Sequence, residues 1–359
     1  METEKILMGQ KQLQRWHLMK MVEVGKITLK EAAERIGVSY RQAKRIGRAI
    51  RERGMKGLVH GNRGRPSNHR IRESLREKII ELSKGVYWDF NDTHFTEKLR
   101  ECEGVDVSRE TVRKLRREAG MGPKRRRRGP KHRKRRERMV QEGWMVLWDG
   151  SPHRWFGSKC PPCCLMAAID DATGKLLAAR FFPFESSSGY LWLLKEMVKK
   201  YGIPMIIHQD RHGALHRNDY HWSLEEQLAG RQEPTQVGLA LEALGIRPIF
   251  ALSPQVKGRV EKLFGTLQDR LIAELRLAGL TAPEAANSFL ESTFIQRFNR
   301  RFAVSPRASE KAWRKPPKQL DLDRIISFSY KATVGNDNTV RLGGLTIDIP
   351  PGPPTKILC

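Results

Sequence analysis

The order of apolar runs between residues 143 and 278 is the feature that most limits how this chain can fold. Three short runs come first, and the turn Asp171-Ala-Thr-Gly174 joins the second to the third, which predicts an antiparallel meander. Two further runs follow, each preceded by a segment with helical periodicity. This order predicts an α/β domain in which helices cover both faces of a mixed sheet. We expect strands at 144–149, 164–170, 175–182, 204–210 and 247–251, and helices at 187–201, 235–244 and about 254–278.

Three carboxylates stand at informative positions in this pattern. Asp149 ends the first predicted strand, Asp210 ends the fourth, and Glu261 borders the apolar stripe of the last long helix. If the first and fourth strands are neighbours, both aspartates emerge at one edge of the sheet. Two aspartates and a glutamate meeting there would form an oxygen cage suited to Mg²⁺ or Mn²⁺, and a pair of such ions supports phosphoryl transfer. The alternative is that all three are ordinary solvated surface acids.

Positive charge is concentrated in the first 142 residues. The chain has 359 residues and a formal net charge of +27. Residues 1–142 contain 39 Lys and Arg against 19 Asp and Glu, whereas the rest of the chain contains 28 against 21. Such asymmetry is typical of a nucleic-acid-binding arm joined to a globular body. A basic ribosomal-type tail is the alternative, but tails of that kind lack the helical patterning of this segment.

Residues 1–60 have the pattern of an all-α helix-turn-helix DNA-binding domain. Thr28 and Ser39 each begin a capping-box sequence, and Gly37 stands between the two predicted helices, where the turn requires a positive φ. An ordinary helical hairpin with a solvated basic face is the alternative. The polar face of the second helix is suited to phosphates and base edges in a major groove, and it consists of Tyr40, Arg41, Lys44, Arg45 and Arg48.

Residues 61–142 extend this basic region. Residues 61–70 form a Gly/Arg/Pro linker in which Arg63 and Arg65 either lie in a narrow minor groove or only connect domains. Residues 71–121 predict a second helical DNA-binding domain, and 122–142 a basic linker that contacts phosphates without reading sequence. Within the second domain we expect helices at 73–83, 92–102 and 108–118, the last with an exposed side made of Arg109, Arg113, Lys114 and Arg117.

Several other classes of protein are disfavoured by the sequence. The chain has no run of about 18 apolar residues and no secretory signal near its start, so we expect no membrane partner. Five cysteines do not form a disulfide framework, which favours the cytoplasm. The string Cys160-Pro-Pro-Cys163-Cys164 lacks a second Cys/His pair with the spacing of a zinc site.

Four strings in the second half of the chain carry a family resemblance: Trp148-Asp149-Gly-Ser-Pro-His, Ile169-Asp-Asp-Ala-Thr-Gly174, Gln209-Asp-Arg-His212 and Ser253-Pro-Gln-Val-Lys-Gly-Arg-Val-Glu-Lys262. Together they resemble the catalytic core of DDE transposases, closest to the ISNCY-type enzymes of bacterial insertion sequences, which are relatives of retroviral integrases. The resemblance implies an RNase H-like core at 143–314 with Asp149, Asp210 and Glu261 as its triad. It also implies that Lys257 faces the same groove and contacts DNA.

The same resemblance implies a function. We expect a transposase, a DDE-type polynucleotidyl transferase, that binds the terminal inverted repeats of an insertion sequence and catalyses DNA cleavage and strand transfer. Its cofactor would be Mg²⁺ (or Mn²⁺), two ions held by the triad. Its partners would be double-stranded DNA, both element ends and target, and further copies of itself on that DNA, in the nucleoid of a bacterial cytoplasm. The alternative is a catalytically inactive, transposase-derived repressor that binds DNA sequence-specifically.

Two segments depart from the common pattern of the family. An insertion near 213–234 lengthens the interval between Asp210 and Glu261, and we interpret it as a loop or lid. The acids Asp170 and Asp171 are expected to form the hairpin turn rather than the site. Residues 315–359 predict a C-terminal β segment with strands at 324–333 and 339–349, either shortened relative to the relatives or packed as a hairpin on its neighbour.

Overall fold

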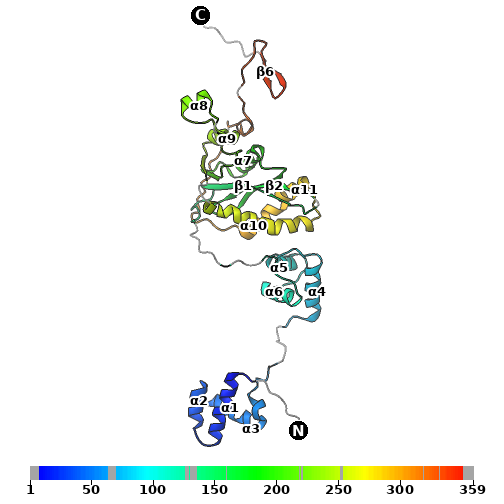
Figure 1. Ribbon diagram of the computed structural model, residues 1–359, viewed down its shortest axis with the longest axis vertical. Coiled ribbons are helices and arrows are strands. Elements are labelled where there is room, and N and C mark those ends of the chain that lie inside the picture. Colours follow the sequence, from blue (N-terminus) through cyan, green and yellow to red (C-terminus); the bar gives the residue numbers. More distant parts are fainter. Residues whose placement is uncertain are drawn as a thin grey trace. The chain divides into compact units, whose positions relative to one another are not determined.

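The computed structural model describes residues 8–63, 70–125, 129, 136–158, 160–217, 219, 221–250, 254–317, 319–330 and 332–350, with only the backbone at 254–257. It divides into two compact units, Met1–Arg76 and Glu77–Cys359 (Figure 1). Within the described residues, no helix combines the length and the apolar character needed to cross a bilayer.

The first unit contains three helices around a small apolar core. The Thr28 hydroxyl accepts a hydrogen bond from the Glu31 amide, and the Glu31 carboxylate accepts one from the Thr28 amide, which completes the predicted capping box. Gly37 has the positive φ of 73° that the turn requires, and Ser39 caps the next helix. The helices α1, α2 and α3 span Gln10–Glu23, Leu29–Ile36 and Tyr40–Arg53, and the 3₁₀ turn η1 spans Gly54–Leu58.

Three helices also form the start of the second unit, close to the expected bounds. They are α4 (Glu73–Lys84), which crosses the boundary between the units, α5 (Asp92–Glu101) and α6 (Arg109–Glu118). Asp92 accepts hydrogen bonds from Arg116 and Arg117 across this bundle. The expectation that Arg117 lies on the exposed side of α6 is therefore wrong, because Asp92 and the Met121 carbonyl draw its guanidinium inward.

A five-stranded sheet in the order β3-β2-β1-β4-β5 forms the centre of the second unit. β1 pairs antiparallel with β2 and parallel with β4, so the meander and the mixed sheet are confirmed. β1 continues past Asp149 to His153, which corrects the expectation that Asp149 ends the strand. The strands are β1 (Met145–His153), β2 (Cys163–Asp170), β3 (Leu176–Phe182), β4 (Ile206–Gln209) and β5 (Arg247–Phe250).

Helices cover both faces of this sheet (Figure 1). Val146 and Trp148 pack in the core shared with α7 and α9, whereas Leu147 packs in the core shared with α10 and α12, as the two-residue period of a strand requires. This strand order with two helical layers is the RNase H-like arrangement. The helices are α7 (Ser187–Tyr201), α8 (Leu224–Ala229), α9 (Gln236–Ala243), α10 (Pro254–Leu277), α11 (Pro283–Phe289), the π-helical turn η2 (Leu290–Phe294) and α12 (Ile295–Phe302).

Two turns decide the remaining expectations. Asp170 accepts hydrogen bonds from the Gly143 and Thr173 amides and the Thr173 hydroxyl, which confirms its role in the hairpin turn. The prediction of a strand at 324–333 is wrong. Asp321 caps a short helix there, α13 (Leu322–Ile325), and the described residues of 324–333 contain no strand. The C-terminal hairpin instead consists of β6 (Thr339–Leu342) and β7 (Leu345–Asp348), which turn at the positive-φ pair Gly343-Gly344.

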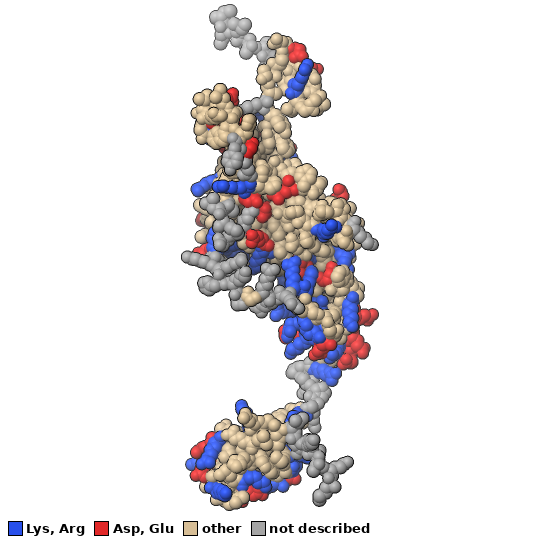
Figure 2. Space-filling model, in the orientation of Figure 1, with Lys and Arg blue, Asp and Glu red and all other residues tan. Residues whose placement is uncertain are grey.

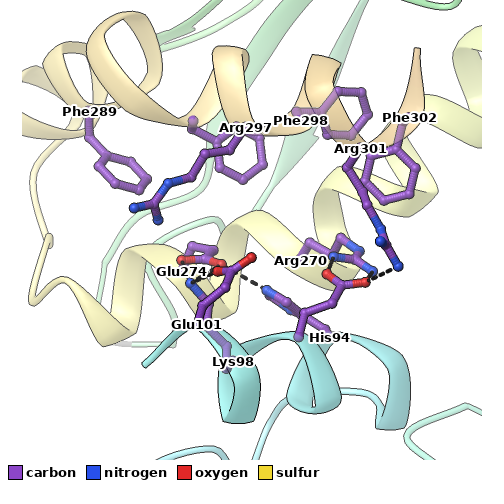
Figure 3. A pocket seen from close by; sticks show the side chains of 12 residues that line it. His94, Lys98, Glu101, Arg270, Glu274, Phe289, Arg297, Phe298, Arg301 and Phe302 are labelled. Atoms are coloured by element: carbon purple, nitrogen blue, oxygen red, sulfur yellow. Dashed lines mark hydrogen bonds and ion pairs between the residues drawn. The ribbon is translucent and has the colours of Figure 1, made fainter. Parts of the chain in front are cut away.

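Paired charges join α5 to α10. His94 Nε2 and Lys98 Nζ lie 2.8 and 2.9 Å from the Glu274 carboxylate, and Arg270 pairs with Glu97 at 2.6 Å. His94 and Lys98 are almost fully buried. Figure 3 shows His94, Lys98, Arg270 and Glu274 close together. These side chains line a cavity of about 100 Å³. The arrangement satisfies buried charges at the helix contact, and removing one partner would leave the others uncompensated.

We expect Glu274→Gln to destabilise the second unit by about 3 kcal/mol, because it leaves the buried Lys98 ammonium without its carboxylate. The midpoint of thermal unfolding, followed by tryptophan fluorescence, measures the effect. Arg113→Gln is the matched control, because Arg113 and its partner Glu110 are exposed. A midpoint that falls equally in both variants would contradict the importance of the buried network.

Stability should also decrease as the pH falls below about 6.5. Burial lowers the pKa of His94, and the charge of Arg270 lowers it further, against the opposing effect of Glu274. The unfolded chain therefore binds this proton more tightly than the folded chain, so stability present above the unfolded pKa is lost below it. His94→Gln should flatten the dependence of the thermal midpoint on pH between about 7 and about 5. An unchanged profile in that variant would disprove the assignment to His94.

Candidate active site

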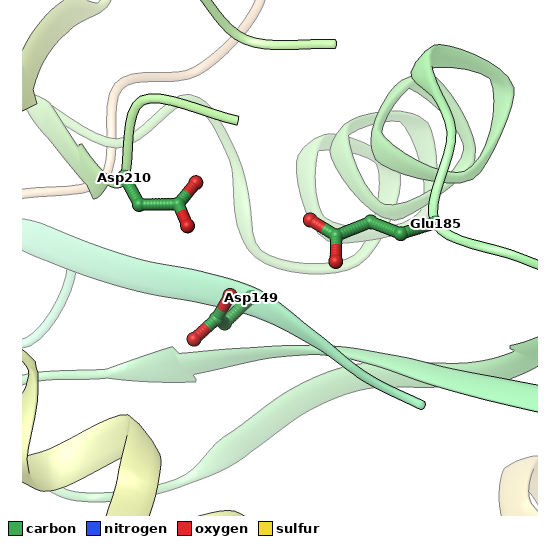
Figure 4. Close-up of side chains that lie close together, drawn as sticks. All are labelled: Asp149, Glu185 and Asp210. Carbon is green, nitrogen blue, oxygen red and sulfur yellow. The ribbon is translucent and has the colours of Figure 1, made fainter. Parts of the chain in front are cut away.

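Three carboxylates converge at one edge of the sheet. Asp149 lies on β1, Asp210 directly follows β4, and Glu185 precedes α7. One carboxylate oxygen from each lies within 4.8 Å of the others, and all three residues are half-buried (Figure 4). Such a group of oxygen ligands is a candidate site for a divalent cation.

The parallel pairing of β1 with β4 places the two aspartates side by side. Leu147 is the register partner of His208, and two residues further along each chain are Asp149, still on β1, and Asp210, directly after β4. Because a strand repeats its side-chain direction every two residues, the two carboxylates leave the sheet together. The Asp149 carboxylate accepts a hydrogen bond from the Gly150 amide, and that of Asp210 accepts one from the His212 amide. The sequence-based condition that these strands be neighbours is confirmed.

Glu185 is held toward the aspartates by its own contacts. The buried Tyr190 hydroxyl donates a hydrogen bond to Glu185 Oε1 at 2.5 Å, and His212 Nδ1 lies 3.6 Å from the same oxygen. Burial, and then the charge of Glu185, raise the pKa of Tyr190, so this hydroxyl remains a donor. A Cβ at position 150 would lie 2.5 Å from Glu185 Oε2, so Gly150 leaves the space that the carboxylate occupies.

Glu185 is a site residue that the sequence motifs do not predict. Its position between a strand and the N-cap Ser186 is an ordinary place for a solvated acid, and no motif distinguishes it from other acids. The signal that identifies it is tertiary. The loop after β3 returns to the edge where β1 and β4 meet, which a pattern of local periodicity does not show.

Glu261 lies on α10, is exposed, and is not one of the three clustered carboxylates. Gln268, seven residues later on the same helix, donates a hydrogen bond to the Ser151 hydroxyl of β1 at 3.3 Å. Seven residues span about two turns, so Glu261 and Gln268 share the side of α10 that faces β1. The structure thus brings Asp149 and Asp210 together and leaves Glu261 outside their cluster, and its membership of the triad stays a prediction. The side chain of Lys257 lies outside the described residues.

The predicted DNA-contacting side chains of the first unit are accessible. All five polar residues on the face of α3 are exposed, and the Lys44 ammonium lies 4.9 Å from the centre of the Tyr40 ring. Arg63 is exposed, whereas Arg65 lies outside the described residues. On α6, Arg109 and Arg113 are exposed, and Arg113 pairs with Glu110. Figure 2 shows that acidic and basic side chains are interspersed over the visible surface of the first unit.

Comparison with known proteins identifies the family. Transposase y4bF of Sinorhizobium fredii (strain NBRC 101917 / NGR234) is 38% identical over 320 residues, which cover 89% of this chain and 68% of that protein. The chain belongs to the transposase family. The transposase for insertion sequence IS1202 of Streptococcus pneumoniae is 31% identical and aligns over 90% of this transposase and 75% of its own length. No family model matches.

Solved integrase structures show weaker similarity to this transposase. The HTLV-2 integrase catalytic core domain in complex with magnesium covers 42% of the chain and 83% of its own length, with a TM-score of 0.29 and 16% identity. A chain of the simian T-cell lymphotropic virus intasome in complex with PP2A regulatory subunit B56 gamma covers 74% and 84%, with a TM-score of 0.35 and 16% identity.

We expect Mg²⁺ to raise the thermal midpoint of this transposase, because a ligand that binds the folded state alone stabilises it by about 2.7 kcal/mol at a hundredfold excess over Kd. Asp149→Asn and Asp210→Asn should abolish the shift. Gly150→Ala should reduce it, because the added methyl group displaces the Glu185 carboxylate. Asp106→Asn, at an exposed acid remote in sequence, is the control. A full shift in both aspartate variants would exclude cation binding at this edge.

Proposed function

We propose that this transposase binds the terminal inverted repeats of an insertion sequence and catalyses divalent-metal-dependent cleavage and strand transfer of DNA. The observation that carries the proposal is the meeting of Asp149 of β1 with Asp210, which directly follows the parallel neighbour β4. These are the two aspartates that the sequence motifs select, in a chain whose curated relatives are transposases.

The donor set of the cluster fits a hard cation. All three ligating groups are carboxylates, with no cysteine and no histidine, and this composition favours Mg²⁺ or Mn²⁺ over zinc. Asp149, Asp210 and Glu261 are the residues that would hold two such ions, and Glu185 supplies a further carboxylate beside the aspartates. When bound, the ions would lower the pKa of the attacking water or hydroxyl group and stabilise the negative charge that develops on the leaving oxygen.

The residues of the chain would prepare the DNA for this chemistry. The Asp149 carboxylate accepts a hydrogen bond from the Gly150 amide, and the Asp210 carboxylate accepts one from the His212 amide. These hydrogen bonds restrain the orientation of both side chains. The face of α3 would read the repeats, whereas the basic linker at 122–142 would contact phosphates of any sequence. Water would cut the transferred strand to leave a 3′-hydroxyl, which then attacks a phosphodiester of the target DNA.

The same proposal includes the partners and the place of action. The substrates are double-stranded element ends and target DNA, and copies of the chain would assemble on paired ends in the bacterial nucleoid. The alternative function is that of a DNA-binding repressor derived from a transposase. The exposure of Glu261 favours it, because such a repressor needs no complete triad. The two functions differ in whether DNA is cut.

Cleavage of labelled DNA carrying the ends of the insertion sequence that encodes the chain tests the proposal. With Mg²⁺ or Mn²⁺ the wild-type protein should nick these ends, and Asp149→Asn, Asp210→Asn and Glu261→Gln should each reduce the rate by about a thousandfold or more without weakening DNA binding. Glu284→Gln, at an exposed acid of α11, should retain the wild-type rate. Binding of the ends without any nicking would establish the repressor instead.

A further inference from the structure

Residues 222–242 form an acidic segment in a strongly basic chain. They include four glutamates and one arginine, a net charge of −3, whereas the whole chain has a formal net charge of +27. Glu225, Glu233 and Glu242 are exposed, and Glu226 is buried in an ion pair with Arg217. The segment includes α8 and most of α9, which lie side by side at the outside of the sheet domain (Figure 1). Its charge repels DNA phosphates, so DNA is not the ligand that this segment fits.

Two cavities open on this segment, and Glu233 and Glu242 belong to the lining of both. The larger has a volume of about 430 Å³, and its lining includes Trp222 and Phe250. The smaller has a volume of about 250 Å³, and its lining includes Glu225. Carboxylates beside aromatic rings suit a lysine or arginine side chain, because both attract the cation and the aliphatic stem covers apolar surface. The cavities therefore fit a basic protein surface.

Exposed apolar side chains accompany the cavities. Leu224 and Leu228 are 72% and 82% exposed, and they share one face of α8 because they are four residues apart. Gln236 of α9 exchanges two hydrogen bonds with the backbone of Ser329, which brings the neighbours of Ser329 beside α9. Single exposed apolar residues are ordinary, whereas a group of them is typical of a surface that binds another protein. The group consists of Trp222, Leu224, Leu228, Leu239, Phe328 and Tyr330.

A second copy of this chain has the charge that such a surface requires, with 67 Lys and Arg against 40 Asp and Glu. Two copies repel each other through their net charges unless an acidic surface of one meets a basic surface of the other. A two-fold contact would place the two 222–242 segments against each other and bring like charges together. The favourable contact is therefore heterologous, with the acidic segment of one copy against a different, basic surface of the next.

We propose that the acidic and apolar surface formed by residues 222–242, 328 and 330 binds the basic surface of a second copy of this transposase. Lysine or arginine side chains of the second copy enter the two cavities, and its apolar groups cover the leucines of α8. This inference deepens the proposed assembly on DNA by naming the contact surface, and it rests on that proposal only for its purpose. The contact itself forms without DNA.

Sedimentation velocity of the nuclease-treated, full-length protein without DNA tests this inference. The wild type should form oligomers whose average mass increases with protein concentration, and about 0.5 M salt should weaken them because it screens the charges. Glu225→Lys combined with Glu242→Lys should raise the dissociation constant at least about tenfold, since the new lysines face a basic partner. Asp106→Lys combined with Glu284→Lys is the matched control, because both acids are exposed and the net charge changes equally.

Two further measurements separate the parts of the contact. Leu228→Ser should also weaken association, about threefold to tenfold, because it removes an apolar side chain that the contact buries. A fluorescently labelled protein with Glu225→Lys and Glu242→Lys should not associate with itself. It should nevertheless join the oligomers of excess unlabelled wild type, because its own basic surface still binds an intact acidic one.

Three results would overturn the inference. They are a wild type that remains monomeric up to about 100 μM, a dissociation constant that changes equally in the two double variants, and association that stops at a dimer, which would indicate a two-fold contact. Failure of the proposed function is a separate observation, since it would appear as an absence of nicking at the element ends. Sedimentation without DNA does not depend on that reaction.

Discussion

The parallel pairing of β1 with β4 is the contact on which the candidate active site depends. The two strands lie far apart in sequence, with β2, β3 and α7 between them. Their register sets Asp149 beside Asp210. A shift of one residue would reverse the side-chain directions of one strand and separate the carboxylates to opposite faces. Burial on both faces prevents that shift, because Trp148 and Leu147 would have to exchange cores.

Much of this arrangement could be predicted from sequence, since it depends on local periodicity. The capping box at Thr28, the turn at Gly37 and the strands of the sheet all follow from residues close together in the chain. The predicted strand ends at Asp149 whereas β1 continues to His153, because the run of apolar residues ends before the hydrogen-bonded ladder does. The C-terminal turn at Gly343-Gly344 falls inside the segment 339–349, for which the sequence predicts a single strand.

The parts that sequence could not supply are those in which distant groups meet. Glu185 joins the aspartates only because the loop after β3 returns to the active edge, and Arg117 turns inward only because Asp92 lies across the bundle. The network at Glu274 is of the same kind, with partners 180 and 176 residues apart in the chain. The sequence shows which charged residues are present, but tertiary packing determines which of them form pairs.

The bonds between α5 and α10 have a mechanical consequence. The α5 segment contacts α10 through Asp269, Arg270 and Glu274, so it is attached along about one and a half turns of the long helix rather than at one point. An attachment at several points resists relative rotation far better than a single hinge. Any displacement of the 77–121 bundle would therefore act on α10 as a torque, and the stiffness of that joint would set how much of the displacement reaches the other end of the helix.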